Sequence, residues 1–111
     1  MAETRRKPIP LVEVDDEGFV VHPETWTREV AEVLARDEVE GGLTHEHWRV
    51  IEYLRQYFLG SGSVPPVRKL SHDTGCSLKQ AYRLFPSGLT YGACRLAGIP
   101  RLAVRPGLNY P

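Results

Sequence analysis

VPPVRKLSHDTGCSLKQAYRLF, residues 64–85, has the pattern of two short helices joined by a tight turn. Pro66 suits the first turn of a helix, where a backbone N–H is not needed, and Gly75 can end that helix with a positive φ. Ser77 and Gln80 form a capping-box pattern that predicts a second helix running to the end of the stretch. The pair is therefore predicted to be a helix-turn-helix-like element.

The second of these helices raises the possibility of nucleic-acid binding. In helix-turn-helix geometry Lys79, Gln80 and Arg83 would face a DNA groove. The other face, expected to point toward the core, carries Leu78, Ala81 and Leu84. Many helix pairs that bind no DNA share this pattern, so the pattern alone does not decide between the two interpretations.

Two further helices are predicted upstream. The first runs from about Pro23 or Thr27 to Asp37 on an i, i+3, i+4 stripe of apolar residues. The second begins after Thr44, whose side chain can cap it. Its apolar face, which we interpret as core rather than as a cofactor site, carries Trp48, Ile51, Leu54, Tyr57 and Phe58. A flexible break is expected at residues 60–63, which read GSGS.

The N-terminal region has a different character. Two short β-rich runs, residues 9–14 and 18–21, are separated by an acidic, glycine-containing turn and predict a hairpin. Residues 1–8 are polar and are expected to form a disordered arm.

The C-terminal region completes the expected fold. A last short helix is predicted over residues 89–98, with Thr90 as its cap, and the proline- and glycine-containing segment 101–111 is expected to be a flexible arm. The predicted fold class is mainly α (α+β). An N-terminal β-hairpin precedes a small orthogonal helical bundle with the helix-turn-helix-like element, and residues 9–100 form the single domain.

Composition narrows the class of protein. The chain has 111 residues, 41% of them hydrophobic, which suits one small globular domain without a deep catalytic cavity. It has no apolar run long enough to span a bilayer and no secretory h-region, so a cytoplasmic protein is expected. No metal-ligand spacing, cofactor motif or catalytic constellation appears, so we expect no metal, no cofactor, no membrane association and no independent catalysis.

The zero net charge conceals two oppositely charged halves. Residues 1–63 carry 7 basic and 13 acidic residues, a net charge of −6, whereas residues 64–111 carry 7 basic residues and one acid, a net charge of +6. The basic half suggests an anionic partner, either nucleic acid or an acidic protein surface. Attraction between the two halves explains the asymmetry equally well.

Six motifs, in order along the chain, resemble those of the DsrC/TusE family, small sulfur-trafficking proteins described as the gamma subunit of dissimilatory sulfite reductase or as a tRNA-thiolation relay protein. The motifs are Asp16–Phe19, Pro23–Thr27, Leu43–Trp48, Pro65–Arg68, Leu84–Gly88 and Ala93–Pro100. The resemblance covers about residues 9–100. It implies a mostly helical fold with an N-terminal hairpin and a mobile C-terminal arm.

The resemblance also points to a cysteine pair that is incomplete here. In the family the arm carries sulfur on a penultimate cysteine, and DsrC proper has a second cysteine eleven positions earlier. Cys94 occupies the earlier position, but Arg105 stands eleven residues later and no cysteine follows Cys94. An arm-to-body disulfide is therefore impossible with Cys94 alone, and in this respect the chain resembles a divergent member of the family.

Two functions remain open at this level. The first is a sulfur carrier acting through Cys94, with Arg95, Arg101 and Arg105 lowering the thiol pKa and contacting partners. Those partners would be sulfur-donor or sulfur-acceptor proteins, such as a sulfite-reductase-like or heterodisulfide-reductase-like enzyme. The second is a regulatory or DNA-binding adaptor that kept the fold, with Cys94 buried and inert. Cys76 is expected to be a packing residue.

Overall fold

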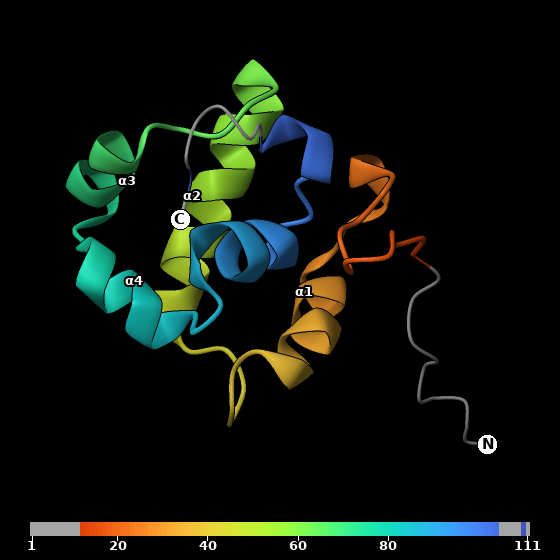
Figure 1. Cartoon of the computed structure of the whole chain (residues 1–111), viewed down its shortest axis with the longest axis horizontal. Coiled ribbons are helices and arrows are strands. Elements are labelled where there is room, and N and C mark those ends of the chain that lie inside the picture. The colour runs from red at the N-terminus through yellow and green to blue at the C-terminus, as the bar shows by residue number, and fades with distance from the viewer. Residues whose placement is uncertain (1–11, 105–109, 111) are drawn as a thin grey trace.

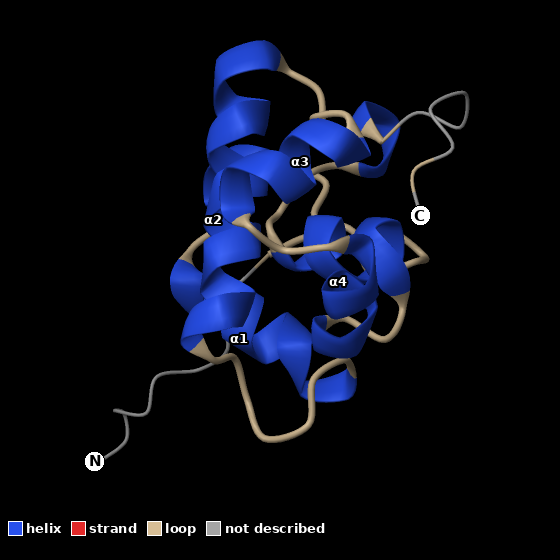
Figure 2. Cartoon of the chain, turned by 90° about the vertical axis from the view of Figure 1, so that its left-hand side faces the viewer, coloured by secondary structure: helices blue, strands red, loops and turns tan. Residues whose placement is uncertain are grey.

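The computed structural model describes residues 12–104 and residue 110. Figure 1 shows α2 running through the middle of the molecule, with α3 and α4 on one side and α1 on the other. The helical segments in chain order are η2 (Pro23–Thr25), α1 (Arg28–Leu34), η3 (Ala35–Asp37), α2 (His45–Ser61), α3 (Val67–Thr74), α4 (Leu78–Leu84), η4 (Leu89–Cys94) and η5 (Arg101–Ala103). In Figure 2, coloured by secondary structure, the residues that the structure describes form helices and loops only. The predicted mainly helical class is confirmed.

Local capping signals account for the positions of the helices. The Thr27 hydroxyl accepts a hydrogen bond from the Val30 N–H at the start of α1. Ser77 does the same for α4, where the Gln80 side chain completes the predicted capping box. Gly75 ends α3 with φ +74°, a conformation that costs glycine little. The helix-turn-helix-like pair therefore forms as its sequence predicts.

One local prediction needs a shift of bounds and two are wrong. The break expected at residues 60–63 does not begin at Gly60: α2 continues to Ser61 and ends within that stretch at Gly62, whose φ is +78°. Leu78 was expected to face the core but is exposed, because α4 turns this residue outward at its first position. Thr90 is not a helix cap, since it lies inside η4, which follows Gly88 and is wound as a π-helix.

The N-terminal hairpin is not confirmed. Within the described residues it is represented by one antiparallel bridge between Val14 and Val20. The Asp15 carboxylate organises the turn by accepting hydrogen bonds from the Glu17 and Phe19 N–H groups, both at 2.9 Å. The first part of the predicted strand, like the predicted arm at residues 1–8, lies outside the described residues.

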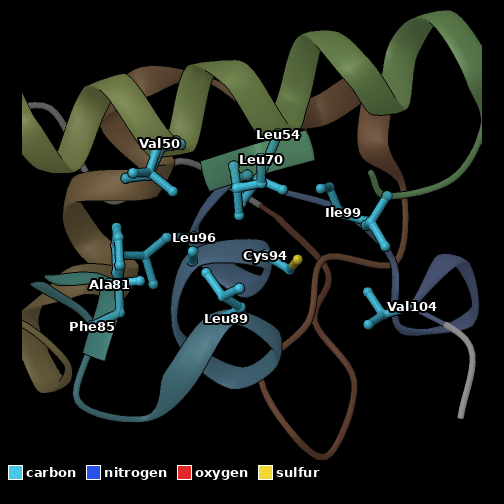
Figure 3. Packing of buried hydrophobic residues seen from close by; sticks show 14 of the residues in the cluster. Val50, Leu54, Leu70, Ala81, Phe85, Leu89, Cys94, Leu96, Ile99 and Val104 are labelled. Atoms are coloured by element: carbon cyan, nitrogen blue, oxygen red, sulfur yellow. The ribbon is translucent and has the colours of Figure 1, made fainter. Parts of the chain in front are cut away.

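The core lies between α2 and the segment that follows α4 (Figure 3). It is a single cluster of buried apolar side chains, and its larger members include Ile51, Leu54, Leu70, Phe85, Leu89, Leu96 and Ile99. Of the predicted apolar stripe on α2, Ile51 and Leu54 are fully buried, while Trp48 and Phe58 pack at the edge of the cluster. Within residues 12–104, no helix combines the length and the apolar character needed to cross a membrane.

Candidate functional site

Cys94, the residue expected to carry sulfur, is the last residue of η4 and lies inside the core cluster with no exposed surface. Figure 3 shows its sulfur atom among the apolar side chains, on the side where Ile99 and Val104 lie. Burial raises the pKa of the Cys94 thiol far above its ordinary value, because the thiolate would lose its hydration. The expectation that nearby cations lower this pKa is therefore wrong.

Arg95, the residue after Cys94, contacts η3 and does not lower the pKa of the Cys94 thiol. Its Nε donates a hydrogen bond to the Tyr91 carbonyl at 2.8 Å, and its Nη2 lies 3.3 Å from Asp37 Oδ1. The Glu38 carboxylate lies 4.0 Å from the same nitrogen. Arg95 is almost fully buried, and the carboxylates of Asp37 and Glu38 neutralise its charge. These contacts link the end of η4 to η3.

Arg101, a second predicted partner-binding cation, is also engaged within the chain. It pairs with Glu17 in the N-terminal turn. Its guanidinium carbon lies 5.7 Å from the centre of the Phe19 ring and 5.5 Å from that of Tyr91, within cation–π range. The start of the C-terminal segment is thus tied to the N-terminal turn. The third cation, Arg105, lies outside the described residues.

Two side chains from the first half of the chain hydrogen-bond to the backbone that follows Cys94, at Leu96 and Ala97. The indole N–H of Trp26 donates to the Leu96 carbonyl at 2.8 Å, and Arg55 Nη1 donates to the Ala97 carbonyl at 3.1 Å. The Arg55 guanidinium also lies over the Trp26 ring, 4.4 Å from its centre. Burial lowers the pKa of Arg55. These contacts make the backbone on the C-terminal side of Cys94 part of the rigid core.

Tyr110, the penultimate residue, contributes to the surroundings of Cys94, a role that the sequence did not predict. The Thr90 hydroxyl donates a hydrogen bond to the Tyr110 carbonyl at 3.0 Å, and the tyrosine side chain packs against the core cluster. The Tyr110 hydroxyl is buried and has no hydrogen-bond partner among the described residues. Burial is the main cause that raises the pKa of the Tyr110 hydroxyl, because the phenolate would lose its hydration.

The candidate nucleic-acid-binding residues share the exposed surface of α4. Lys79, Gln80 and Arg83 are all exposed. The Gln80 side chain accepts a hydrogen bond from the Ser77 N–H at 2.9 Å, so it is committed to the capping box. Lys79 and Arg83, one helical turn apart, are thus the two exposed cations of this set.

Cys76, the other thiol, lies in the turn between α3 and α4. It is half-buried at a small depression of about 50 Å³ that Thr74, Gln80 and Leu84 also line. Burial is the main cause of its raised pKa. Among residues 12–104 and 110, no group of three histidine, cysteine or acidic side chains is arranged to hold a metal ion.

The family model and the most similar known proteins agree on one family for this chain. The family model described as "DsrC like protein" matches residues 10–103. The gamma subunit of dissimilatory-type sulfite reductase from Nitratidesulfovibrio vulgaris is 39% identical over 89 residues, which cover 80% of this chain and 85% of that protein. Sulfurtransferase TusE from Escherichia coli (strain K12) is 32% identical over 98 residues, covering 81% and 88%.

Solved structures agree with the sequence relatives. The crystal structure of the oxidised gamma subunit of dissimilatory sulfite reductase (DsrC) from Archaeoglobus fulgidus superimposes with a TM-score of 0.77 at 41% sequence identity. The match covers 84% of this chain and 90% of that one. On these findings, the chain belongs to the DsrC-like protein family.

Proposed function

We propose that this chain is a sulfur-relay protein of the DsrC/TusE type, working through partner proteins, with Cys94 as its sulfur-bearing residue. The observation that carries the proposal is the family match, which extends over residues 10–103 and includes Cys94. Relatives named as a sulfite reductase subunit and as a sulfurtransferase imply partners that donate or accept sulfur.

The proposed chemistry is sulfane-sulfur exchange at one thiol. The Cys94 thiolate attacks the outer sulfur of a donor protein's persulfide, a new S–S bond forms, and the donor leaves as a thiolate. An acceptor thiolate then attacks the outer sulfur of the Cys94 persulfide and releases Cys94. No net oxidant or reductant is needed, because each step exchanges one S–S bond for another.

Such a cycle requires the site to open. The structure buries the Cys94 sulfur completely, and burial raises the thiol pKa, so Cys94 cannot react until water and a partner reach it. Residues 95–111 contain no cysteine, so the proposed cycle uses no disulfide between Cys94 and these residues. The relay is therefore proposed to depend on a single thiol and on movement of the residues that cover it.

The DNA-binding alternative lacks support. The family match and the relatives named above concern sulfur proteins, and nothing in them favours a regulator. Exposure of Lys79 and Arg83 is ordinary for the solvent side of a surface helix.

Intact-mass spectrometry after incubation with a protein persulfide donor tests the proposal. We expect the wild-type chain and Cys76→Ala to gain the mass of one sulfur atom, and Cys94→Ala to gain none. The adduct should disappear on treatment with a thiol reductant. A sulfur adduct that persists in Cys94→Ala, or no adduct on any folded form, would refute Cys94 as the carrier.

A further inference from the structure

We propose that Arg95 is a positioning residue for Cys94: the hydrogen bond from its Nε to the Tyr91 carbonyl holds η4 in the π-helical winding that keeps the thiol in the core. This inference deepens the proposed function and rests on it for its biological meaning. The winding of η4, and the part that Arg95 plays in it, can be tested without any sulfur transfer.

The winding of η4 determines which of its side chains share a face. Leu89 and Cys94, the first and last residues of η4, are both fully buried in the same apolar cluster (Figure 3). In an α-helix, residues five positions apart point about 140° away from each other, because one turn takes 3.6 residues. In a π-helix, the i→i+5 hydrogen bonds bring such residues onto one face. The π winding is therefore what allows Leu89 and Cys94 to enter the core together.

The Arg95 side chain takes the place of its own backbone N–H at one carbonyl of this helix. In an α-helix the Arg95 N–H would donate to the Tyr91 carbonyl, four residues earlier. Here the Arg95 N–H donates to the Gly92 carbonyl, and the Tyr91 carbonyl accepts a hydrogen bond from Arg95 Nε at 2.8 Å. A side chain that enters the backbone ladder in this way favours a departure from regular α geometry. The Nε hydrogen bond therefore stabilises the π winding.

Two carboxylates hold the Arg95 guanidinium in the position that this hydrogen bond needs. Nη2 lies 3.3 Å from Asp37 Oδ1 and 4.0 Å from Glu38 Oε1. The Glu38 side chain is itself buried and accepts a hydrogen bond from the Ser87 N–H at 2.8 Å. Because the guanidinium is anchored at this end, Nε remains at the Tyr91 carbonyl.

Loss of the π winding would change the surroundings of the thiol. The C-terminal end of η4 is held independently of the Arg95 side chain, by the hydrogen bonds to the Leu96 and Ala97 carbonyls. If η4 rewound as an α-helix, Leu89 and Cys94 could not both keep their places in the core. Either Cys94 would turn away from the cluster or Leu89 would withdraw from it. Both changes give solvent and reagents a path to the sulfur.

The first measurement detects the hydrogen bonds of η4 directly, through the scalar couplings across them in a long-range HNCO spectrum of isotope-labelled protein. In the wild-type chain we expect the Arg95 N–H to couple to the Gly92 carbonyl carbon and Arg95 Nε to the Tyr91 carbonyl carbon. In Arg95→Gln and Arg95→Lys, the backbone N–H at position 95 should couple to the Tyr91 carbonyl carbon, the α-helical pattern. Lysine keeps the positive charge beside Asp37 but has no Nε–H, so Arg95→Lys separates the hydrogen bond from the ion pair.

The second measurement is the alkylation rate of Cys94 by N-ethylmaleimide in a Cys76→Ser background, so that only one thiol reacts. We expect both Arg95 variants to raise this rate at least about fivefold, because it follows the population of forms that expose the thiol. Two controls should keep the wild-type winding and stay within about twofold of the parent rate. Val30→Ala truncates a buried side chain outside the Cys94 cluster, and Arg68→Ala removes an exposed cation on α3.

Each outcome decides for or against the proposal. A wild-type spectrum in which the Arg95 N–H couples to the Tyr91 carbonyl carbon would overturn it, and this test requires no variant to fold. Retention of the wild-type couplings at position 95 in folded Arg95→Lys would also contradict it, because charge alone would then hold the winding. If Val30→Ala accelerates alkylation as much as the Arg95 variants do, the effect is a general loss of stability and the proposal is wrong.

Failure of the sulfur relay gives a different result from failure of this inference. Rewinding and faster alkylation in the Arg95 variants of a chain that takes up no sulfur at Cys94 would support the positioning role and refute the relay. Sulfur uptake at Cys94 together with unchanged winding in both Arg95 variants would support the relay and refute the positioning role.

Discussion

The indole ring of Trp26 lies directly against the α-carbon of Gly98. A Cβ added at Gly98 would stand 2.4 Å from Trp26 Cδ1, closer than nonbonded carbon atoms approach, and the residue has φ +73°. The same ring hydrogen-bonds to the Leu96 carbonyl, so this contact joins the entry of α1 to the backbone that follows Cys94. Only glycine satisfies both the backbone conformation and the space.

Gly98→Ala should therefore be strongly destabilising. The clash with Trp26 and the left-handed backbone together should cost about 3 kcal/mol or more in the free energy of unfolding. Gly62→Ala is the matched control, because Gly62 has φ +78° but open space around its α-carbon, so it should cost only about 1 kcal/mol. Urea unfolding measures both, and similar losses in the two variants would contradict the role of Trp26.

His47 should matter to stability far more than its neighbour His45. Its Nδ1 accepts a hydrogen bond from the Thr44 N–H at 3.0 Å, which leaves Nε2 to donate to the Leu84 carbonyl at 2.9 Å. One buried ring thus caps α2 and ties it to the end of α4. His47→Ala should cost about 2–3 kcal/mol, and exposed His45→Ala less than about 0.5 kcal/mol. Equal thermal midpoints for the two variants would refute this assignment.

The contact between Tyr53 on α2 and Asp73 on α3 should make stability depend on pH at both extremes. The hydrogen bond from the Tyr53 hydroxyl is the main cause that lowers the pKa of Asp73 from 3.8 to about 2. Burial, followed by the same bond, raises the pKa of Tyr53 from 10.0 to about 12. A lowered acid pKa contributes stability above about pH 4 that is lost as the pH falls toward 2. A raised tyrosine pKa contributes stability below pH 10 that is lost as the pH rises toward 12.

Tyr53→Phe should weaken both pH dependences, because it removes the shared hydrogen bond. Lys69 and His72 still contact Asp73 in this variant, so part of the acid dependence remains. The check is the thermal midpoint measured from pH 2 to 5 and from pH 9 to 12, with Tyr57→Phe as the control. A variant whose two slopes match those of the wild type would show that the contact does not form in solution.

The two cysteines should differ in what their removal costs. Cys94→Ala leaves a small void in the core and should lower stability by about 1–2 kcal/mol, whereas Cys76→Ala, at a half-buried turn, should cost less than about 0.5 kcal/mol. Thermal unfolding measures the difference. Equal costs would mean that Cys94 is not packed in the core. Both variants should remain folded, which the persulfide experiment requires.

Much of the helical framework could be predicted from the sequence. The caps at Thr44 and Ser77 and the stop at Gly75 act within about four residues, so the signal and its structural effect lie in the same short stretch. The family resemblance, carried by six ordered motifs, was likewise present in the sequence and is confirmed by the comparisons. Local chemistry therefore determined the positions of the helices.

The surroundings of Cys94 were decided by tertiary structure. Arg95 follows Cys94 in the chain, yet it pairs with Asp37, 58 residues away in sequence, because the backbone of η4 directs the two side chains apart. Tyr110 meets Thr90 across 20 residues of a segment with no local pattern that predicts the contact. Burial and charge pairing depend on which distant surfaces pack together, so the sequence alone identified the thiol, and only the packing of the folded chain determined that it is covered.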